Sequence, residues 1–156
     1  MLNLGFKKRT GMIFTRSVAE GVLGWVGLNQ ATRRQAPGHV EVNPVIGIRH
    51  QQVERIVAQL RHKKFHPYIP PTVSRPLGYL MPEANYRTWV LGAVEATQAQ
   101  SADLVGAILS YGQPFMESGS TLPGLCRLIE DGVGFDFLLN YRRPVALALA
   151  VKQLVR

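Results

Sequence analysis

The sequence has little of what a disulfide scaffold or a membrane span requires. Its 156 residues include one cysteine, so no internal disulfide is possible and nothing indicates an oxidising compartment. It contains no run of about 18 apolar residues that could cross a bilayer. No basic start followed by an apolar core and a cleavage site marks a signal peptide. We therefore expect a cytoplasmic protein that does not enter the membrane.

Residues that carry catalysis are also few, with ten acidic side chains and four histidines. His62 and His66 stand four residues apart, but a zinc site usually needs three or four ligands. Cys126 lies on an apolar stripe, where a cysteine acts as a small hydrophobe unless a histidine lies beside it. No phosphate-binding glycine motif is present. We expect no metal, no cofactor and no enzymatic activity, and a catalytic site around Cys126 or His50 is the alternative.

Positive charge is abundant. Lys and Arg outnumber Asp and Glu by 18 to 10, which gives a net charge of +8. This balance favours nucleic acid, an acidic protein surface or an anionic membrane as partner. Basic residues beside aromatic ones suit phosphate contacts with base stacking, and they equally suit a protein interface. A solvated surface is the simplest alternative. The basic clusters are Lys7-Lys8-Arg9, Arg33-Arg34, Arg61–Lys64 and Arg142-Arg143, with Phe6, Phe65, Tyr68 and Tyr141 nearby.

The first third of the chain is typical of β-strands. We expect strands over residues 12–16, 22–32 and 40–49, separated by short polar loops, and in the third strand Val40, Val42, Ile46 and Ile48 keep a period of two. Such an order predicts an antiparallel meander. Because proline cannot donate to a sheet ladder, Pro44 places the third strand at an edge or at a bulge.

The apolar spacing then changes to that of a helix. Val53, Ile56, Val57 and Leu60 predict an amphipathic helix over residues 51–63. An extended proline-rich loop follows over residues 64–76. We expect short strands at 77–81 and 86–91, and helices at 95–111, 122–131 and 144–155, the first of them stopped by Gly112. The sequence therefore predicts one α+β domain over residues 1–156, an antiparallel sheet of about four to five strands with helices packed on one face.

Short motifs at several points of the chain carry a family resemblance. They are residues 5–9 (Gly-Phe-Lys-Lys-Arg), Phe14 with Arg16, 25–30, 40–47 and 111–115, followed by a short helix near Leu122. In these segments the sequence resembles the bacterial family catalogued as domain of unknown function 4304. Similar small domains often stand beside secreted toxins, so the resemblance implies an immunity-type binding role, with no site residue. That family usually has a helix before residue 5, so we also expect a helix upstream of Met1.

Charge, composition and resemblance together predict a non-enzymatic protein-binding domain, an immunity protein that neutralises a cognate bacterial toxin. Its positive charge would steer it to an acidic surface, and the stiff proline-rich loop would lose little entropy on binding. The alternative is a basic nucleic-acid-binding module, whose affinity falls steeply with salt. The residues we expect at the contact surface are Arg33, Arg34, Arg61, Lys63, Lys64 and Tyr68.

Overall fold

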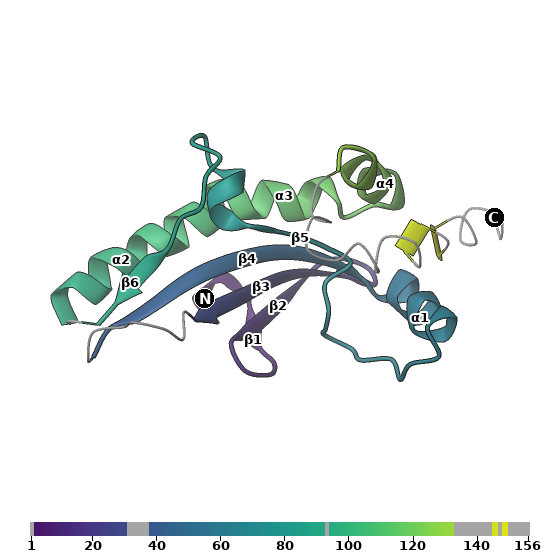
Figure 1. Cartoon of the computed structure of the whole chain (residues 1–156), viewed down its shortest axis with the longest axis horizontal. Coiled ribbons are helices and arrows are strands. Elements are labelled where there is room, and N and C mark those ends of the chain that lie inside the picture. The colour runs from purple at the N-terminus through teal and green to yellow at the C-terminus, as the bar shows by residue number, and fades with distance from the viewer. Residues whose placement is uncertain (1, 31–37, 93, 133–144, 147, 150–156) are drawn as a thin grey trace.

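An antiparallel sheet of six strands carries helices on one face, which confirms the predicted α+β class (Figure 1). The computed structural model describes residues 2–30, 38–92, 94–132, 145, 146, 148 and 149. The strands lie in the order β1-β2-β3-β4-β5, and β6 pairs with the other end of β4. Their bounds are β1 (Lys7–Lys8), β2 (Ile13–Ala19), β3 (Val22–Gln30), β4 (Val40–His50), β5 (Val73–Pro76) and β6 (Trp89–Leu91).

The helices follow the long strand β4 and its neighbours. In Figure 1, α2 and α3 run along one face of the sheet, and α1 lies beyond the end of β4. Within the residues described, no helix is both long and apolar enough to cross a bilayer. The bounds are α1 (Gln51–Leu60), α2 (Val94–Ala107), α3 (Gln113–Ser118) and α4 (Leu122–Glu130), with 3-10 turns at Leu2–Leu4 and Leu77–Leu80 and a π turn at Ile108–Gly112.

The core lies between the helices and the face of the sheet that they cover. Phe14, Val26 and Ile46 are neighbours across β2, β3 and β4, and all three are buried. Met116 of α3 packs against Gly24 on the same face. Because successive side chains of a strand point to opposite faces, alternate residues such as Val42, Ile46 and Ile48 of β4 enter one apolar layer, as the sequence predicted for this strand.

A loop, and not a helix, covers part of the opposite face. Trp25 and Gly47 are register partners on that face. The indole Nε1 of Trp25 donates a hydrogen bond to the carbonyl oxygen of Tyr68 at 2.9 Å. Pro71 packs directly over Gly47. The segment of residues 65–71, here called the proline loop, is thus bound to the sheet.

Pro44 was predicted to lie at an edge or a bulge, and this was wrong. It sits opposite Leu28 in unbroken register within β4, which has β3 on one side and β5 and β6 on the other. Strand β6 pairs with residues 40–42 and β5 with residues 45–48. Because neither strand pairs with Pro44, its missing N–H removes no ladder bond on that side.

Other local signals were overridden by packing. Gly112 does not end a helix: it has helical dihedral angles and lies against Ile46, and the π turn leads into α3 with Pro114 in its first turn. The strand predicted at 77–81 is a 3-10 turn, and β5 lies within the stretch predicted as a loop. Helix α1 ends at Leu60, because His62 has a left-handed φ of 51°.

The remaining predicted elements are partly observed. Only Trp89–Leu91 of the strand predicted at 86–91 pairs with β4. Helix α4 ends close to its predicted end, and Gly132 has a φ of 71°. Most of the helix predicted at 144–155 lies outside the described residues. Of the described residues there, Val145, Ala148 and Leu149 are buried in the core.

Replacing Gly47 with alanine should destabilise the fold by about 1–3 kcal/mol, because the added carbon overpacks the proline loop. A Cβ at Gly47 would lie 2.7 Å from Pro71 Cβ and 3.1 Å from the backbone oxygen of Val73. Urea denaturation measures the cost. Gly106→Ala is the matched control: nothing lies within 4 Å of its added Cβ in α2, so a gain of about 0.5–1 kcal/mol is expected. Equal stability of the two variants would contradict the packing of the loop on the sheet.

Candidate functional site

The proline loop is held by the buried guanidinium of Arg49, at the end of β4. Arg49 Nε donates to the carbonyl oxygen of Pro67 at 3.1 Å, and its two terminal nitrogens donate to the carbonyls of His66 and Pro70. Its Nη1 lies 3.4 Å from Oε2 of Glu54, in the first turns of α1, and both side chains are at most 3% exposed. These contacts, here called the Arg49 network, join β4, α1 and the loop.

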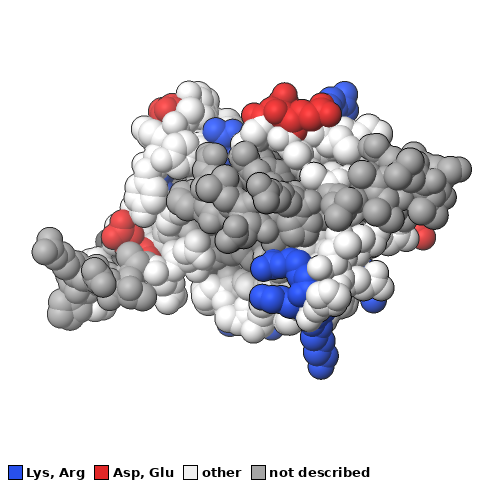
Figure 2. Space-filling model, turned by 45° about the vertical axis from the view of Figure 1, so that its right-hand side comes forward, with Lys and Arg blue, Asp and Glu red and all other residues white. Residues whose placement is uncertain are grey.

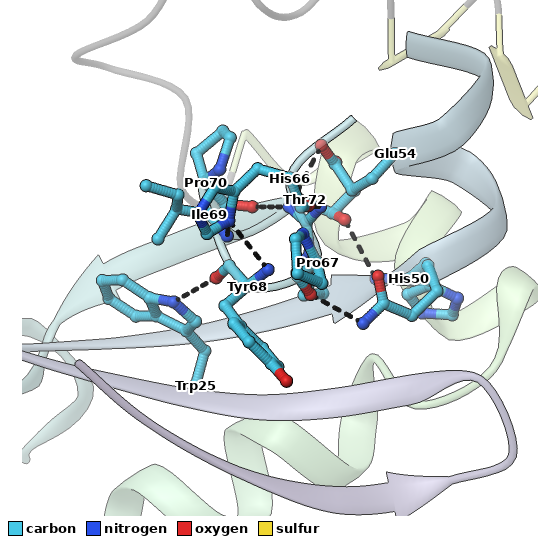
Figure 3. A network of polar contacts seen from close by, with 11 residues as sticks. Trp25, His50, Glu54, His66, Pro67, Tyr68, Ile69, Pro70 and Thr72 are labelled. Atoms are coloured by element: carbon cyan, nitrogen blue, oxygen red, sulfur yellow. Dashed lines mark hydrogen bonds and ion pairs between the residues drawn. The ribbon is translucent and has the colours of Figure 1, made fainter. Parts of the chain in front are cut away.

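Further bonds fix the loop backbone (Figure 3). Gln51 Nε2 donates a hydrogen bond to the Pro67 carbonyl at 2.8 Å, and Trp25 Nε1 donates one to the Tyr68 carbonyl. The ring Nδ1 of His66 accepts the backbone N–H groups of Tyr68 and Ile69 at 3.1 and 3.2 Å. A loop that covers a sheet must satisfy its polar backbone groups, and here side chains from β3, β4 and α1 do so.

A small basic pocket opens between the end of α1 and the proline loop. Its volume is about 90 Å³. Arg61, Lys63 and Lys64 line it and are exposed, whereas Arg49 and Glu54 are buried. Figure 2 shows Lys and Arg side chains gathered in the lower half of the face that it presents. The complete lining is Arg49, Glu54, Val57, Ala58, Arg61, Lys63, Lys64, Phe65, His66, Ile69 and Pro70.

The structure brings three of the six predicted contact residues together at this pocket, namely Arg61, Lys63 and Lys64. Tyr68 is close in sequence but does not line it. Its ring points toward the β1–β2 hairpin, where the guanidinium carbon of Arg9 lies 4.3 Å from the ring centroid (Figure 3). Arg33 and Arg34 lie outside the described residues.

The aromatic rings near the pocket are covered by cations. Arg55 lies 4.3 Å and Arg49 5.4 Å from the ring centroid of Phe65, as Arg9 does over Tyr68. Cation–π contacts of this kind are attractive by about 0.5–1 kcal/mol at exposed sites. Each ring therefore has a face already engaged within the chain.

His50 lines a second, larger hollow of about 510 Å³ together with Glu20 and Gln52. Its Nε2 lies 2.7 Å from the carbonyl oxygen of Gly119. Because a carbonyl only accepts, the ring donates its Nε2 proton there. Burial lowers the pKa of His50 below 6.5, and the bond to Gly119 offsets part of that effect. The lining residues, which are completed by Gly21, Val22 and Val53, include no serine, threonine or cysteine nucleophile.

The other candidate ligands and nucleophiles are dispersed. His62 follows the end of α1, and His66 serves the loop backbone. Cys126 is half-buried in α4, where it packs against the apolar core. Over the described ranges, no three His, Cys, Asp or Glu side chains lie close enough to hold a metal ion.

Sequence reasoning missed the two residues that organise the site. Arg49 is a charged residue in a strand otherwise rich in apolar positions, and Glu54 follows five residues later on the helix. The available signal was this pair of opposite charges beside the apolar positions Ile48 and Val53. It is weak, because each residue alone is typical of a solvated face.

Comparisons with family models, with curated proteins and with solved structures found no match for this chain. The resemblance to the domain of unknown function 4304 family therefore stays a prediction, as does the role that it implies.

Arg49→Met should destabilise the protein by about 3–5 kcal/mol, because it leaves the buried Glu54 carboxylate without its cation. Three loop carbonyls lose the bond from Arg49 as well, although that of Pro67 keeps its bond from Gln51 Nε2. Urea denaturation measures the loss, and amide hydrogen exchange of Tyr68 and Ile69 reports the freed loop. The exposed Arg127, replaced by methionine, serves as control and should stay within about 0.5 kcal/mol of the parent protein. A similarly small effect at Arg49 would show that the network does not hold the loop.

Stability should decrease as the pH falls below 6.5, because His50 binds its proton less readily when folded. Its folded pKa is lowered from 6.5, so between the two pKa values the unfolded chain holds more protons, and acid favours unfolding. Denaturation above and below pH 6.5 tests this. His50→Gln retains an N–H donor for Gly119 without titrating in this range, so its free energy of unfolding should decline less. Parallel pH profiles would refute the assignment.

Proposed function

We propose that this chain is a non-enzymatic protein-binding domain that docks an acidic surface of its partner onto the basic pocket, as an immunity protein does with its toxin. The observation that carries the proposal is the convergence of Arg61, Lys63 and Lys64 on one pocket whose wall is held by a buried network. The fixed wall offers a partner a surface of constant shape, and the exposed cations attract its negative charge.

Lys63 and Lys64 present their charge at the surface of the pocket. Arg49 and Glu54 offset each other at 3.4 Å. In the part of the chain that the structure describes, neither Lys63 nor Lys64 lies within ion-pair distance of a carboxylate. Exposed charges of one sign steer an oppositely charged partner and raise its association rate.

The proline loop also lowers the cost of binding. Carbonyls at positions 66, 67, 68 and 70 are bonded to side chains of the sheet and of α1. A partner therefore meets a loop that is already ordered, and it does not have to supply the free energy of ordering it.

Nucleic acid is the competing partner class, and the aromatic residues argue against it. Binding to single strands relies on bases that stack on free aromatic faces. Phe65 and Tyr68 each carry a guanidinium 4.3 Å from the ring centroid. A base would have to displace these arginines or use the other ring face.

The proposal predicts that the protein captures one partner protein from an extract of its source cells, and that charge reversal at the pocket prevents capture. Tagged protein is incubated with nuclease-treated and untreated extract, and the bound proteins are identified by mass spectrometry. Lys63→Glu with Lys64→Glu should remove the stoichiometric partner. With the purified partner, the same change should slow association by about tenfold or more, an effect that salt reduces.

The control variant is Lys7→Glu with Lys8→Glu, which changes the net charge equally on the exposed edge strand β1, whose residues do not line the pocket. It should retain the partner. Loss of all partners on nuclease treatment would favour nucleic-acid binding, and equal capture by both variants would place the interface elsewhere.

A further inference from the structure

We infer that the basic pocket is an anion subsite that receives one carboxylate of a glutamate or aspartate side chain of the partner, held at its mouth by Lys63 and Lys64. This inference rests on the proposed function and specifies which chemical group the pocket recognises.

The size of the pocket limits its ligand. The pocket volume is about 90 Å³. Sites for nucleotides, cofactors and other ligands of that size occupy about 300–1,000 Å³. The pocket therefore suits the end of one side chain.

The charges of the pocket place the carboxylate at its mouth. On the floor, Arg49 already donates to three carbonyls, and the Glu54 carboxylate beside it would repel a second anion. At the mouth, Lys63 and Lys64 are exposed and lie three and four residues after the end of α1. Lysine ammonium groups bind carboxylates through short, charge-assisted hydrogen bonds.

The walls explain why a side chain suits the pocket better than a free ion. Val57, Ala58, Ile69 and Pro70 line it with apolar atoms. The methylene groups of a glutamate can contact these walls while its carboxylate stays at the lysines. Side chains that anchor an interface fill well-packed pockets of the partner, and a glutamate in this pocket would do so.

The test is a titration of the full ¹⁵N-labelled chain with acetylated hexaglutamate amide, followed by amide chemical shifts. Shifts should concentrate on residues 57–70. Lys63→Gln with Lys64→Gln should weaken binding about fivefold, as expected for the loss of two exposed ion pairs, and Lys63→Arg with Lys64→Arg should retain most of the affinity. Lys7→Gln with Lys8→Gln removes the same charge elsewhere and should change binding less than about twofold.

Three results with the peptides would overturn the subsite. They are no binding of hexaglutamate, equal weakening by the two glutamine variants, or equal binding of hexaglutamine. A ten-thymidine oligonucleotide that binds the same residues more than tenfold tighter would also overturn it, in favour of phosphate. Failure of the subsite alone leaves partner capture intact, whereas failure of the proposed function is seen in the capture experiment.

Discussion

One buried cation organises this end of the molecule. Removing a guanidinium from water costs several kcal/mol unless every donor finds a partner. Arg49 finds its partners in the Glu54 carboxylate and in three carbonyls of the proline loop. The loop conformation and the buried charge therefore require each other. Because Glu54 belongs to α1, the same network also sets where the helix lies relative to the strand that precedes it.

The two faces of the sheet are covered by different means. Helices α2 and α3 bury apolar residues such as Ile46, and on this face the stabilising free energy comes mainly from buried apolar area. On the other face the cover that the described residues provide is a loop, and a loop brings carbonyls that no strand or helix pairs. Trp25, Arg49 and Gln51 supply the donors. Gly47 leaves the room that Pro71 needs. The need to give the loop carbonyls hydrogen-bond donors therefore determines which side chains lie on the face that carries the candidate site.

Local patterns predicted the parts of the fold that depend on near neighbours. The strand-forming runs before residue 50, with period two in β4, and the spacing of Val53, Ile56 and Val57 predicted the meander and α1, because such patterns depend on neighbours along the chain. Pro44 and Gly112 misled, because their roles depend on partners far along the chain: the boundary between β5 and β6 in one case, and Ile46 in the other. The cluster of Arg61, Lys63 and Lys64 was visible as adjacent charges. The Arg49 network could not be seen in the sequence, because Arg49 bonds backbone carbonyls, which every residue has.

Stability and binding need not change together in this arrangement. If the partner binds only the ordered loop, its apparent dissociation constant equals the intrinsic one divided by the ordered fraction. While the ordered form predominates, weakening the Arg49 network lowers stability and leaves affinity nearly unchanged. Once the open form predominates, each further loss of about 1.4 kcal/mol weakens binding tenfold. If the proposed function holds, changes at Lys63 or Lys64 would alter the intrinsic constant from the first charge removed, because these lysines donate none of the bonds of the network. The two effects would then separate residues that hold the loop from residues that contact the proposed partner.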